Sequence, residues 1–323
     1  MVYATCLSLT ACMPMLDSPP LFQSEPVLHK NHFTTRDGLV LPVASWLPAH
    51  QPPRAIVIAL HGFNDYSQAF RTAGAFFQAQ GVGLFAYDQR HFGRSPRPGL
   101  WAGMEAYATD LRDFTRAVHQ HYPGLPVYIL GESMGGAVSI VALQGASAPR
   151  VDGVILVAPA VWGRTTMPWY QRGLLSLLSH TWPALQLTGK GLGIRPTDNV
   201  EVLKGLSRDP WVIKGTRVDA LSGLADLMDA ALAGGTAIRE KRLLLLYGER
   251  DQIIPKAPVQ QFMHSLKGAR KLRIAIYAEG YHLLLRDLGA ERPLRDIAAW
   301  LENPEQPLPS GADRQPESSP ARP

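Results

Sequence analysis

Apolar residues along this chain follow two alternating patterns. Short continuous apolar runs are typical of strands buried on both faces, and such runs stand at residues 55–60, 84–87, 127–130, 154–158, 242–247 and 272–277. Helical spacing of apolar residues predicts helices near residues 68–80, 105–121, 135–144, 258–266 and 293–301. Ahead of them, Asp37-Gly38 predicts a β-hairpin. The alternation predicts an α/β fold with a mostly parallel sheet and helices on both faces.

One strand-to-helix junction carries a nucleophile pattern. Gly131-Glu132-Ser133-Met134-Gly135 follows the apolar run 127–130 and precedes an apolar, helix-competent run. A G-x-S-x-G sequence in a strand–turn–helix setting predicts a serine projecting above the strand end. The helix that starts at Met134 would direct free N–H groups at a developing oxyanion. The plainer alternative is a glycine-rich turn with a bystander serine.

The other parts of an acyl-transfer site stand at other strand ends. The run 55–60 stops at His61-Gly62-Phe63, and we assign the two oxyanion donors to the backbone N–H groups of Phe63 and Met134. Asp251 follows the run 242–247, and His282 follows the run 272–277. The chain order Ser133, Asp251, His282 is the nucleophile, acid, base order of the α/β-hydrolase fold, which excludes the chymotrypsin and subtilisin orders.

Other carboxylates compete for the role of the acid. Asp226, Asp229 and Asp287 lie in helix-like segments, whereas Asp251 stands in a loop after a strand. Glu132 is next to the nucleophile in sequence, which points its side chain away from the imidazole. We therefore predict Asp251 as the acid. No metal site, cofactor or structural disulfide is expected, because the triad needs none and the chain has only 2 cysteines.

Five motifs in order carry a family resemblance. They are H-G-F-N-D-Y-S at 61–67, D-Q-R-H-F-G-R-S at 88–95, G-E-S-M-G-G at 131–136, G-E-R-D-Q-I-I-P at 248–255 and G-Y-H-L-L-L-R-D at 280–287. Together they resemble the monoacylglycerol lipase and lysophospholipase branch of the α/β-hydrolases, the serine aminopeptidase-like group, over about residues 31–301. The resemblance implies a Ser133/Asp251/His282 triad and an oxyanion hole at Phe63 and Met134. One departure is His91, where members of the family commonly have glycine.

The segment 160–235 is an insertion between two predicted strands. It is dense in large apolar residues, and in this architecture an insertion there forms a helical cap over the nucleophile. Part of its apolar surface would pack on the core, and the rest would line an acyl-chain pocket. The candidate substrate-binding residues are Trp162, Met167, Trp169, Leu174 and Leu178.

These observations predict a serine hydrolase that cleaves the ester bond of a single-chain acyl lipid, such as a monoacylglycerol or a lysophospholipid, through an acyl-enzyme. A short-chain carboxylesterase or a serine peptidase of the same fold is the alternative. A non-catalytic binding protein of this fold is a third interpretation, against which stands the presence of all three triad residues. Acyl chain length, head group and oligomeric state stay open.

Charge and termini bear on partners and location. The net charge is +5, but Lys and Arg are scattered along the chain, so we do not expect a nucleic-acid partner. The positive charge is compatible with attraction to an anionic membrane surface. Leu9-Thr10-Ala11-Cys12 matches a bacterial lipobox without a cationic region before it. We interpret residues 1–30 as a truncated lipoprotein signal and tether lipidated at Cys12, which predicts a membrane-associated protein. A cytoplasmic protein is the alternative. Residues 31–302 form the predicted hydrolase domain, and the Pro- and Ser-rich residues 303–323 a disordered tail.

Overall fold

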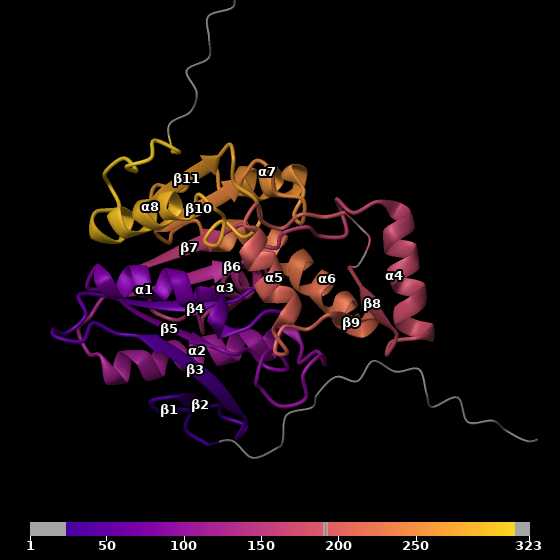
Figure 1. Cartoon of the computed structure of the whole chain (residues 1–323), viewed down its shortest axis with the longest axis horizontal. Helices are drawn as coiled ribbons and strands as arrows, with labels where there is room; N and C mark the ends of the chain where they lie inside the picture. Colours follow the sequence, from indigo (N-terminus) through magenta and orange to yellow (C-terminus); the bar gives the residue numbers. More distant parts are fainter. Residues whose placement is uncertain (1–23, 190, 192, 314–323) are drawn as a thin grey trace, which may run out of the picture.

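A nine-stranded sheet forms the centre of the molecule (Figure 1). The computed structural model describes residues 24–189, 191 and 193–313. In spatial order the strands are β1 (Val27–Leu28), β2 (His32–Thr34), β3 (Val40–Trp46), β5 (Gly83–Tyr87), β4 (Ile56–Leu60), β6 (Val127–Glu132), β7 (Gly153–Val157), β10 (Leu243–Gly248) and β11 (Leu272–Tyr277). The strands from β5 to β11 pair in parallel, and β1 to β3 add antiparallel pairs at one edge. The predicted mostly parallel α/β sheet is confirmed.

Helices cover both faces because alternate strand residues point to opposite sides. In β4, Ile56 and Ile58 pack into the larger core, while Val57 and Ala59 pack into the smaller one. The larger core is covered by α2 (Met104–His121), α3 (Met134–Ala142), α6 (Val218–Ala233) and α7 (Lys256–Ser265). The smaller core is covered by η1 (Ser67–Phe70), α1 (Arg71–Ala79) and α8 (Glu291–Glu302). Both layers are present, as the sequence pattern predicts.

The cap between β7 and α6 is smaller than predicted. It consists of α4 (Trp169–Thr181), α5 (Val200–Arg208) and the antiparallel pair β8 (Gln186–Thr188) and β9 (Gly215–Arg217). Figure 1 shows α4 at the edge of the molecule, away from the sheet. The helix α6, expected in the cap, instead belongs to the sheet layer, because Leu227 and Ala231 are fully buried in the larger core. It is followed by η2 (Gly234–Ile238).

The predicted disorder of the carboxyl-terminal tail is wrong for residues 303–313. The backbone N–H of Ile276 in β11 donates to Ala312 O at 2.9 Å, and Leu308 is buried. The Asp296 carboxylate of α8 accepts the N–H of Ser310 at 2.9 Å. The physical reason is that β11 is an edge strand, whose unpaired N–H groups need partners. Residues 314–323 lie outside the described part of the chain.

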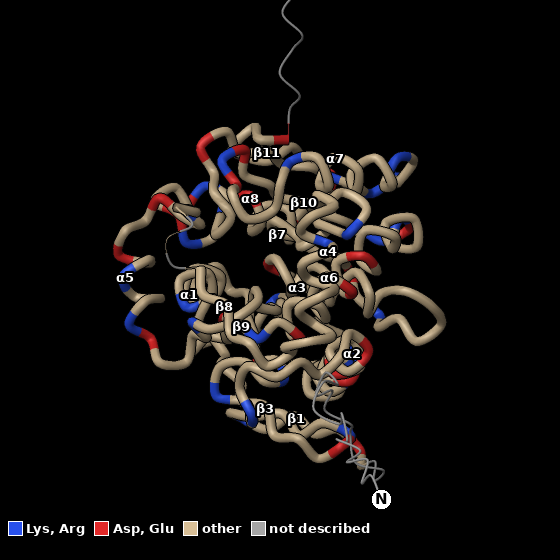
Figure 2. Tube along the Cα trace, turned by 90° about the vertical axis from the view of Figure 1, so that its right-hand side faces the viewer, with Lys and Arg blue, Asp and Glu red and all other residues tan. Residues whose placement is uncertain are grey.

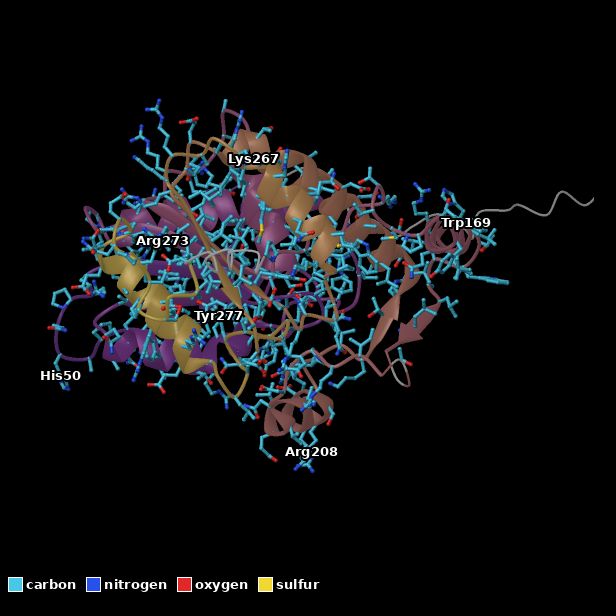
Figure 3. All side chains as sticks on the ribbon, turned by 90° about the horizontal axis from the view of Figure 1, so that it is seen from above. His50, Trp169, Arg208, Lys267, Arg273 and Tyr277 are labelled. Carbon is cyan, nitrogen blue, oxygen red and sulfur yellow. The ribbon has the colours of Figure 1, made fainter. Side chains whose placement is uncertain are left out.

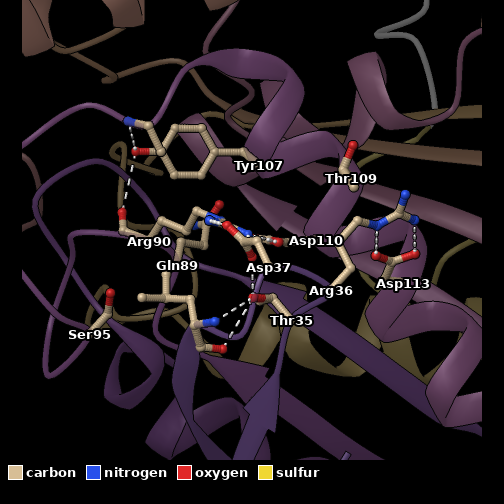
Figure 4. A network of polar contacts seen from close by, with 12 residues as sticks. Thr35, Arg36, Asp37, Gln89, Arg90, Ser95, Tyr107, Thr109, Asp110 and Asp113 are labelled. Atoms are coloured by element: carbon tan, nitrogen blue, oxygen red, sulfur yellow. Dashed lines mark hydrogen bonds and ion pairs between the residues drawn. The ribbon is translucent and has the colours of Figure 1, made fainter. Parts of the chain in front are cut away.

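A buried ionic network fastens the hairpin to the loop after β5 (Figure 4). The Arg90 guanidinium donates to Asp37 Oδ2 at 2.5 Å and to Asp110 Oδ2 at 2.5 Å, and all three side chains are at most 7% exposed. In the same loop His91 has φ 64°, the left-handed region that favours glycine. Its ring Nδ1–H donates to Pro96 O at 2.8 Å, and its N–H donates to the Ser95 hydroxyl at 2.8 Å. His91 therefore adopts the left-handed backbone conformation that a glycine at this position would favour.

Candidate active site

Ser133 stands at a sharp turn between β6 and α3. Its backbone has φ 52° and ψ −115°, an unfavourable conformation for a residue with a Cβ. The turn is held by the N–H of Ser133 donating to Val157 O at 3.0 Å and by the N–H of Ala160 donating to Ser133 O at 2.9 Å. A Cβ at Gly135 would lie 2.1 Å from Leu60 O, so only glycine fits there. This is the strand–turn–helix geometry that the G-x-S-x-G pattern predicts.

His282 and Asp251 form a buried pair on two neighbouring strand ends. The imidazole Nδ1–H donates to Asp251 Oδ2 at 2.8 Å. The other oxygen, Oδ1, accepts the backbone N–H groups of Ile253 at 2.7 Å and Ile254 at 3.0 Å. The Asp251 side chain is fully buried and that of His282 is 6% exposed. This arrangement fixes one tautomer of His282, with the proton on Nδ1 and the lone pair on Nε2.

The loop of His282 reaches the Ser133 turn through an ion pair. Arg286, four residues after His282, donates to Glu132 Oε2 at 2.9 Å. As whole residues, Ser133 is 8% exposed and His282 is 4% exposed, so both are largely shielded from solvent. Among the residues that the structure describes, the Ser133 hydroxyl forms no hydrogen bond to His282. Nucleophile–base hydrogen bonds are often long in enzymes without substrate.

The loop after β4 lies directly against Ser133. A Cβ built at Gly62 would be 3.4 Å from Ser133 Cβ and 3.9 Å from its hydroxyl oxygen. His61, fully buried, donates from Nδ1 to Gly62 O at 2.8 Å and accepts the N–H of Gln89 at Nε2 at 3.0 Å. Burial lowers the pKa of His61, so the ring stays neutral and keeps both bonds. The predicted oxyanion donors Phe63 and Met134 thus stand on the two segments that flank the serine.

The competing carboxylates have other partners. Asp226 and Asp229 both pair with Arg164, at 2.7 Å and 2.6 Å. Asp287 accepts the N–H of Tyr281 at 2.8 Å. Glu132 pairs with Arg286, as described above. Of the carboxylates considered, the structure brings Asp251 to His282.

A second carboxylate joins Glu132 at Arg286, and sequence reasoning missed this cluster. Asp65, in the loop after β4, accepts Arg286 Nη1–H at 2.7 Å. The available signal was the position of Asp65, Glu132 and Arg286 inside three of the five family motifs. Arg286 is 221 residues from Asp65 and 154 residues from Glu132 in the sequence, and local sequence patterns do not predict contacts over such separations.

The predicted substrate-binding residues are spread between core and surface. Trp162 is half-buried and packs against the larger core, and Met167 and Leu178 are half-buried. Trp169 is 78% exposed and Leu174 is 56% exposed. Figure 3 shows Trp169 on α4, at the opposite side of the molecule from Arg273. A role for these residues in an acyl pocket stays a prediction, and Cys12 lies outside the described residues.

Residues 24–189, 191 and 193–313 lack two features that would suggest other functions. No group of three or more His, Cys, Asp or Glu side chains in this part of the chain could hold a metal ion. No helix in it is long and apolar enough to cross a membrane. Lys and Arg are interspersed with Asp and Glu over the side of the molecule in Figure 2.

Comparisons with known proteins identify the family of this chain. The family model described as "Serine aminopeptidase, S33" matches residues 51–289. The chain belongs to this family. It is similar to the monoacylglycerol lipase of Mycolicibacterium smegmatis, with 25% identity over 79% of this chain and 90% of the relative. It is also similar to the human monoglyceride lipase, with 26% identity over 82% of this chain and 87% of the relative.

A solved structure shares the fold. The monoacylglycerol lipase of Paleococcus ferrophilus superposes with a TM-score of 0.68 at 23% identity, over 81% of this chain and 98% of that one. The α/β-hydrolase fold is therefore confirmed, as is the resemblance to the monoacylglycerol lipase branch. The family and its relatives make the chain a hydrolase that acts on esters.

Proposed function

We propose that this protein hydrolyses the ester bond of a monoacylglycerol or a lysophospholipid with Ser133 as nucleophile, His282 as base and Asp251 as the acid that orients His282. The observation that carries the proposal is the 2.8 Å bond between His282 and Asp251, which follow two neighbouring strands and stand at the same edge of the sheet as the Ser133 turn. The names of the two relatives support a monoacylglycerol substrate. A nucleophile, a base and an acid that orients the base are the three roles of a serine-hydrolase triad.

The proposed reaction uses the three side chains in two steps. Ser133 Oγ attacks the ester carbonyl carbon while His282 Nε2 takes its proton, and Asp251 stabilises the imidazolium through Nδ1–H. The N–H groups of Phe63 and Met134 hold the oxyanion. Collapse of the tetrahedral intermediate breaks the ester C–O bond, and His282 gives its proton to the departing alcohol. Water, deprotonated by His282, then attacks the acyl-enzyme. Collapse of this second intermediate breaks the bond to Ser133 Oγ, which takes the proton back from His282 as the fatty acid leaves.

Exposed apolar residues on the cap helix α4 support a lipid substrate and the binding of the protein to a lipid surface. On α4, Trp169, Leu174 and Leu177 are 78%, 56% and 59% exposed, and Trp182 beyond its end is 66% exposed. The helix carries one charged residue, Arg172. Apolar helix faces with tryptophan bind the boundary between lipid head groups and acyl chains. Docking of α4 on a membrane would bring the cap to the lipid phase that holds the substrate. Lipidation at Cys12 would add a second attachment, and a cytoplasmic location is the alternative.

A panel of substrates tests the proposal. Glyceryl monoesters of increasing chain length, lysophospholipids, p-nitrophenyl acetate and aminoacyl amides are compared in kcat/KM, with reactivity toward a fluorophosphonate probe. We expect medium or long monoacyl esters to exceed acetate esters by about 100-fold, because each buried methylene adds about 0.8 kcal/mol of binding. The probe should label wild type and not Ser133→Ala. A flat chain-length profile, or a preference for aminoacyl amides, would favour the carboxylesterase or peptidase alternative, and absence of labelling would favour a binding protein.

A further inference from the structure

A single buried guanidinium joins the three loops to which the reaction is assigned. Arg286 stands four residues after His282. Its Nη1 donates to Asp65 Oδ2 at 2.7 Å, and its Nη2 donates to Glu132 Oε2 at 2.9 Å. Asp65 is two residues after Phe63, and Glu132 is bonded directly to Ser133. Three segments therefore meet at one side chain: the base loop, which follows β11 and carries His282; the nucleophile turn at Ser133; and the oxyanion loop, residues 61–66, which carries Phe63.

Burying these three charged side chains costs free energy unless each charge is paired and hydrogen-bonded. The side chains of Arg286, Asp65 and Glu132 are 8%, 11% and 1% exposed. Burial raises the pKa of Glu132, and the charge of Arg286 opposes that rise. Removing one partner from a buried ion pair leaves an uncompensated charge, whereas replacing all partners by neutral groups is often tolerated. An arginine fork suits the site because it donates to two carboxylates in fixed directions.

Sheet pairing alone does not hold the base loop to the nucleophile turn. The strands β4 and β6, which lead to Asp65 and Ser133, are direct neighbours. By contrast β11, which leads to His282, is separated from β6 by β7 and β10. The two Arg286 hydrogen bonds span this separation. The loop is held on its other side by the N–H of Leu283, which donates to Pro196 O of the cap segment at 2.9 Å.

We propose that Arg286 is a positioning residue for the hydrolysis, which fixes His282 relative to Ser133 and to the Phe63 oxyanion donor. This inference rests on the proposed function. The residue acts through Asp65 and Glu132 and does not touch the reacting atoms. A displacement of about 1 Å in a catalytic group can lower a rate about 100-fold. The expected effect of losing the guanidinium is therefore on kcat and not on substrate binding.

The test compares Arg286→Met, Arg286→Lys and the neutral triple variant Asp65→Asn/Glu132→Gln/Arg286→Met with wild type. The control is Arg273→Met, since Arg273 stands near the beginning of β11, at the end opposite to the His282 loop, and pairs with Asp313. Folded fraction and Tm are measured with kcat, KM and the rate of fluorophosphonate labelling. We expect Arg286→Met to lower kcat and labelling about 100-fold with KM changed less than about 3-fold. Arg286→Lys should be intermediate, because an ammonium keeps the charge without the fork, and Arg273→Met should keep wild-type kcat.

The triple variant separates positioning from relief of buried charge. It removes all three charges, so we expect it to regain most of the Tm that Arg286→Met loses while kcat stays low. Wild-type kcat in the triple variant or in folded Arg286→Met would overturn the inference. If Arg286→Met does not fold, the triple variant and Arg286→Lys decide the matter. Failure of the fluorophosphonate to label wild type would instead defeat the proposed function, so the two failures are distinct.

Discussion

Asp251 holds His282 with one carboxylate oxygen and its own loop with the other. Oδ2 accepts the imidazole Nδ1–H at 2.8 Å, while Oδ1 accepts the N–H groups of Ile253 and Ile254. The loop bonds stop the carboxylate from rotating, so the ring it orients cannot turn away. The pair is thus rigid before any substrate arrives, as orientation of a general base requires.

Replacing this carboxylate by an amide should leave the loop intact and disturb the ring. In Asp251→Asn, the amide oxygen can still accept the two loop N–H groups, but its NH2 then faces His282 and favours the wrong tautomer. We expect kcat to fall about 10³- to 10⁴-fold with little change in Tm. Steady-state kinetics with a glyceryl monoester measure the loss, and Asp226→Asn is the control. Full activity of Asp251→Asn together with an inactive Asp226 or Asp287 variant would show that the acid is assigned wrongly.

Loss of the nucleophile or the base should be more severe. Ser133→Ala and His282→Ala should each lower kcat roughly 10⁴-fold or more, and the double variant should be no worse than either, because triad members act as a unit. Residual turnover would come from the oxyanion donors and substrate binding. Kinetics of the two single variants and the double variant measure this. Additive losses in the double variant would contradict a shared mechanism.

The oxyanion loop is tied to the cap by three hydrogen bonds. Asn64 Nδ2 donates to the Thr216 hydroxyl at 2.6 Å, Tyr66 OH donates to Asp209 Oδ2 at 2.7 Å, and the N–H of Ile213 donates to Asn64 O at 3.0 Å. Tyr66→Phe should loosen residues 209–217, since a hydrogen bond to a charged group contributes about 1.5–3 kcal/mol. We expect faster amide hydrogen exchange there and about 3- to 10-fold lower kcat/KM for long-chain esters, with acetate esters unchanged. An equal loss on acetate would show that the bond serves the catalytic centre itself.

The Arg90 network predicts a pH-dependent loss of stability. Burial raises the pKa of Asp110 to about 6 even though Arg90 opposes the rise. Arg90→Met removes that opposition, so the pKa of the carboxyl rises further and its ionised form must be buried without a partner at neutral pH. We expect a loss of about 3–5 kcal/mol near pH 8. A folded-state pKa above the unfolded one means a penalty that grows as pH rises and disappears as pH falls.

The free energy of unfolding that Arg90→Met loses relative to wild type should therefore become smaller as the pH is lowered from 8 to 5. Urea unfolding at both values measures the difference, and Arg36→Met is the control, because Asp113, its partner, keeps a second ion pair with Arg116. A deficit that is the same at both pH values would mean that lost packing and not a buried charge is the cause. A larger deficit at pH 5 would contradict the sign of the argument.

The exposed face of α4 should decide activity at a lipid surface. Trp169→Asp and Leu174→Asp place charge on the face proposed to enter the boundary of the bilayer. We expect each to lower binding to phosphatidylglycerol-containing vesicles and hydrolysis of long-chain monoacylglycerol in those vesicles by about 10-fold, because the substitution removes a large apolar side chain whose full burial contributes about 1.5–3 kcal/mol. Hydrolysis of soluble acetate esters should be unchanged, and Val27→Asp, at a 42% exposed apolar residue of β1, is the control. Unchanged vesicle binding in both variants would contradict docking through α4.

Local patterns in the sequence predicted the scaffold, which the structure confirms, and selected the candidate reacting groups. Continuous apolar runs specify strands buried on both faces, and glycines at 131 and 135 are readable because the turn at Ser133 brings backbone within 2.6 Å of where a side chain would stand. Asp251 and His282 could be selected because each stands in the loop that follows a strand, and the carboxyl ends of parallel strands lie at one edge of the sheet. These signals are short in range, so the linear order of residues contains them.

Contacts between distant segments were decided by the tertiary structure alone. The bonds of Arg286 to Asp65 and Glu132, the docking of residues 303–313 on the edge strand β11, and the placement of α6 in the sheet layer depend on which surfaces meet after folding. The Pro- and Ser-rich composition of the tail favours disorder, but an unpaired edge strand offers hydrogen bonds that composition does not report. A pattern records the preference of a segment, whereas its final partner depends on the free energy of the whole packed molecule.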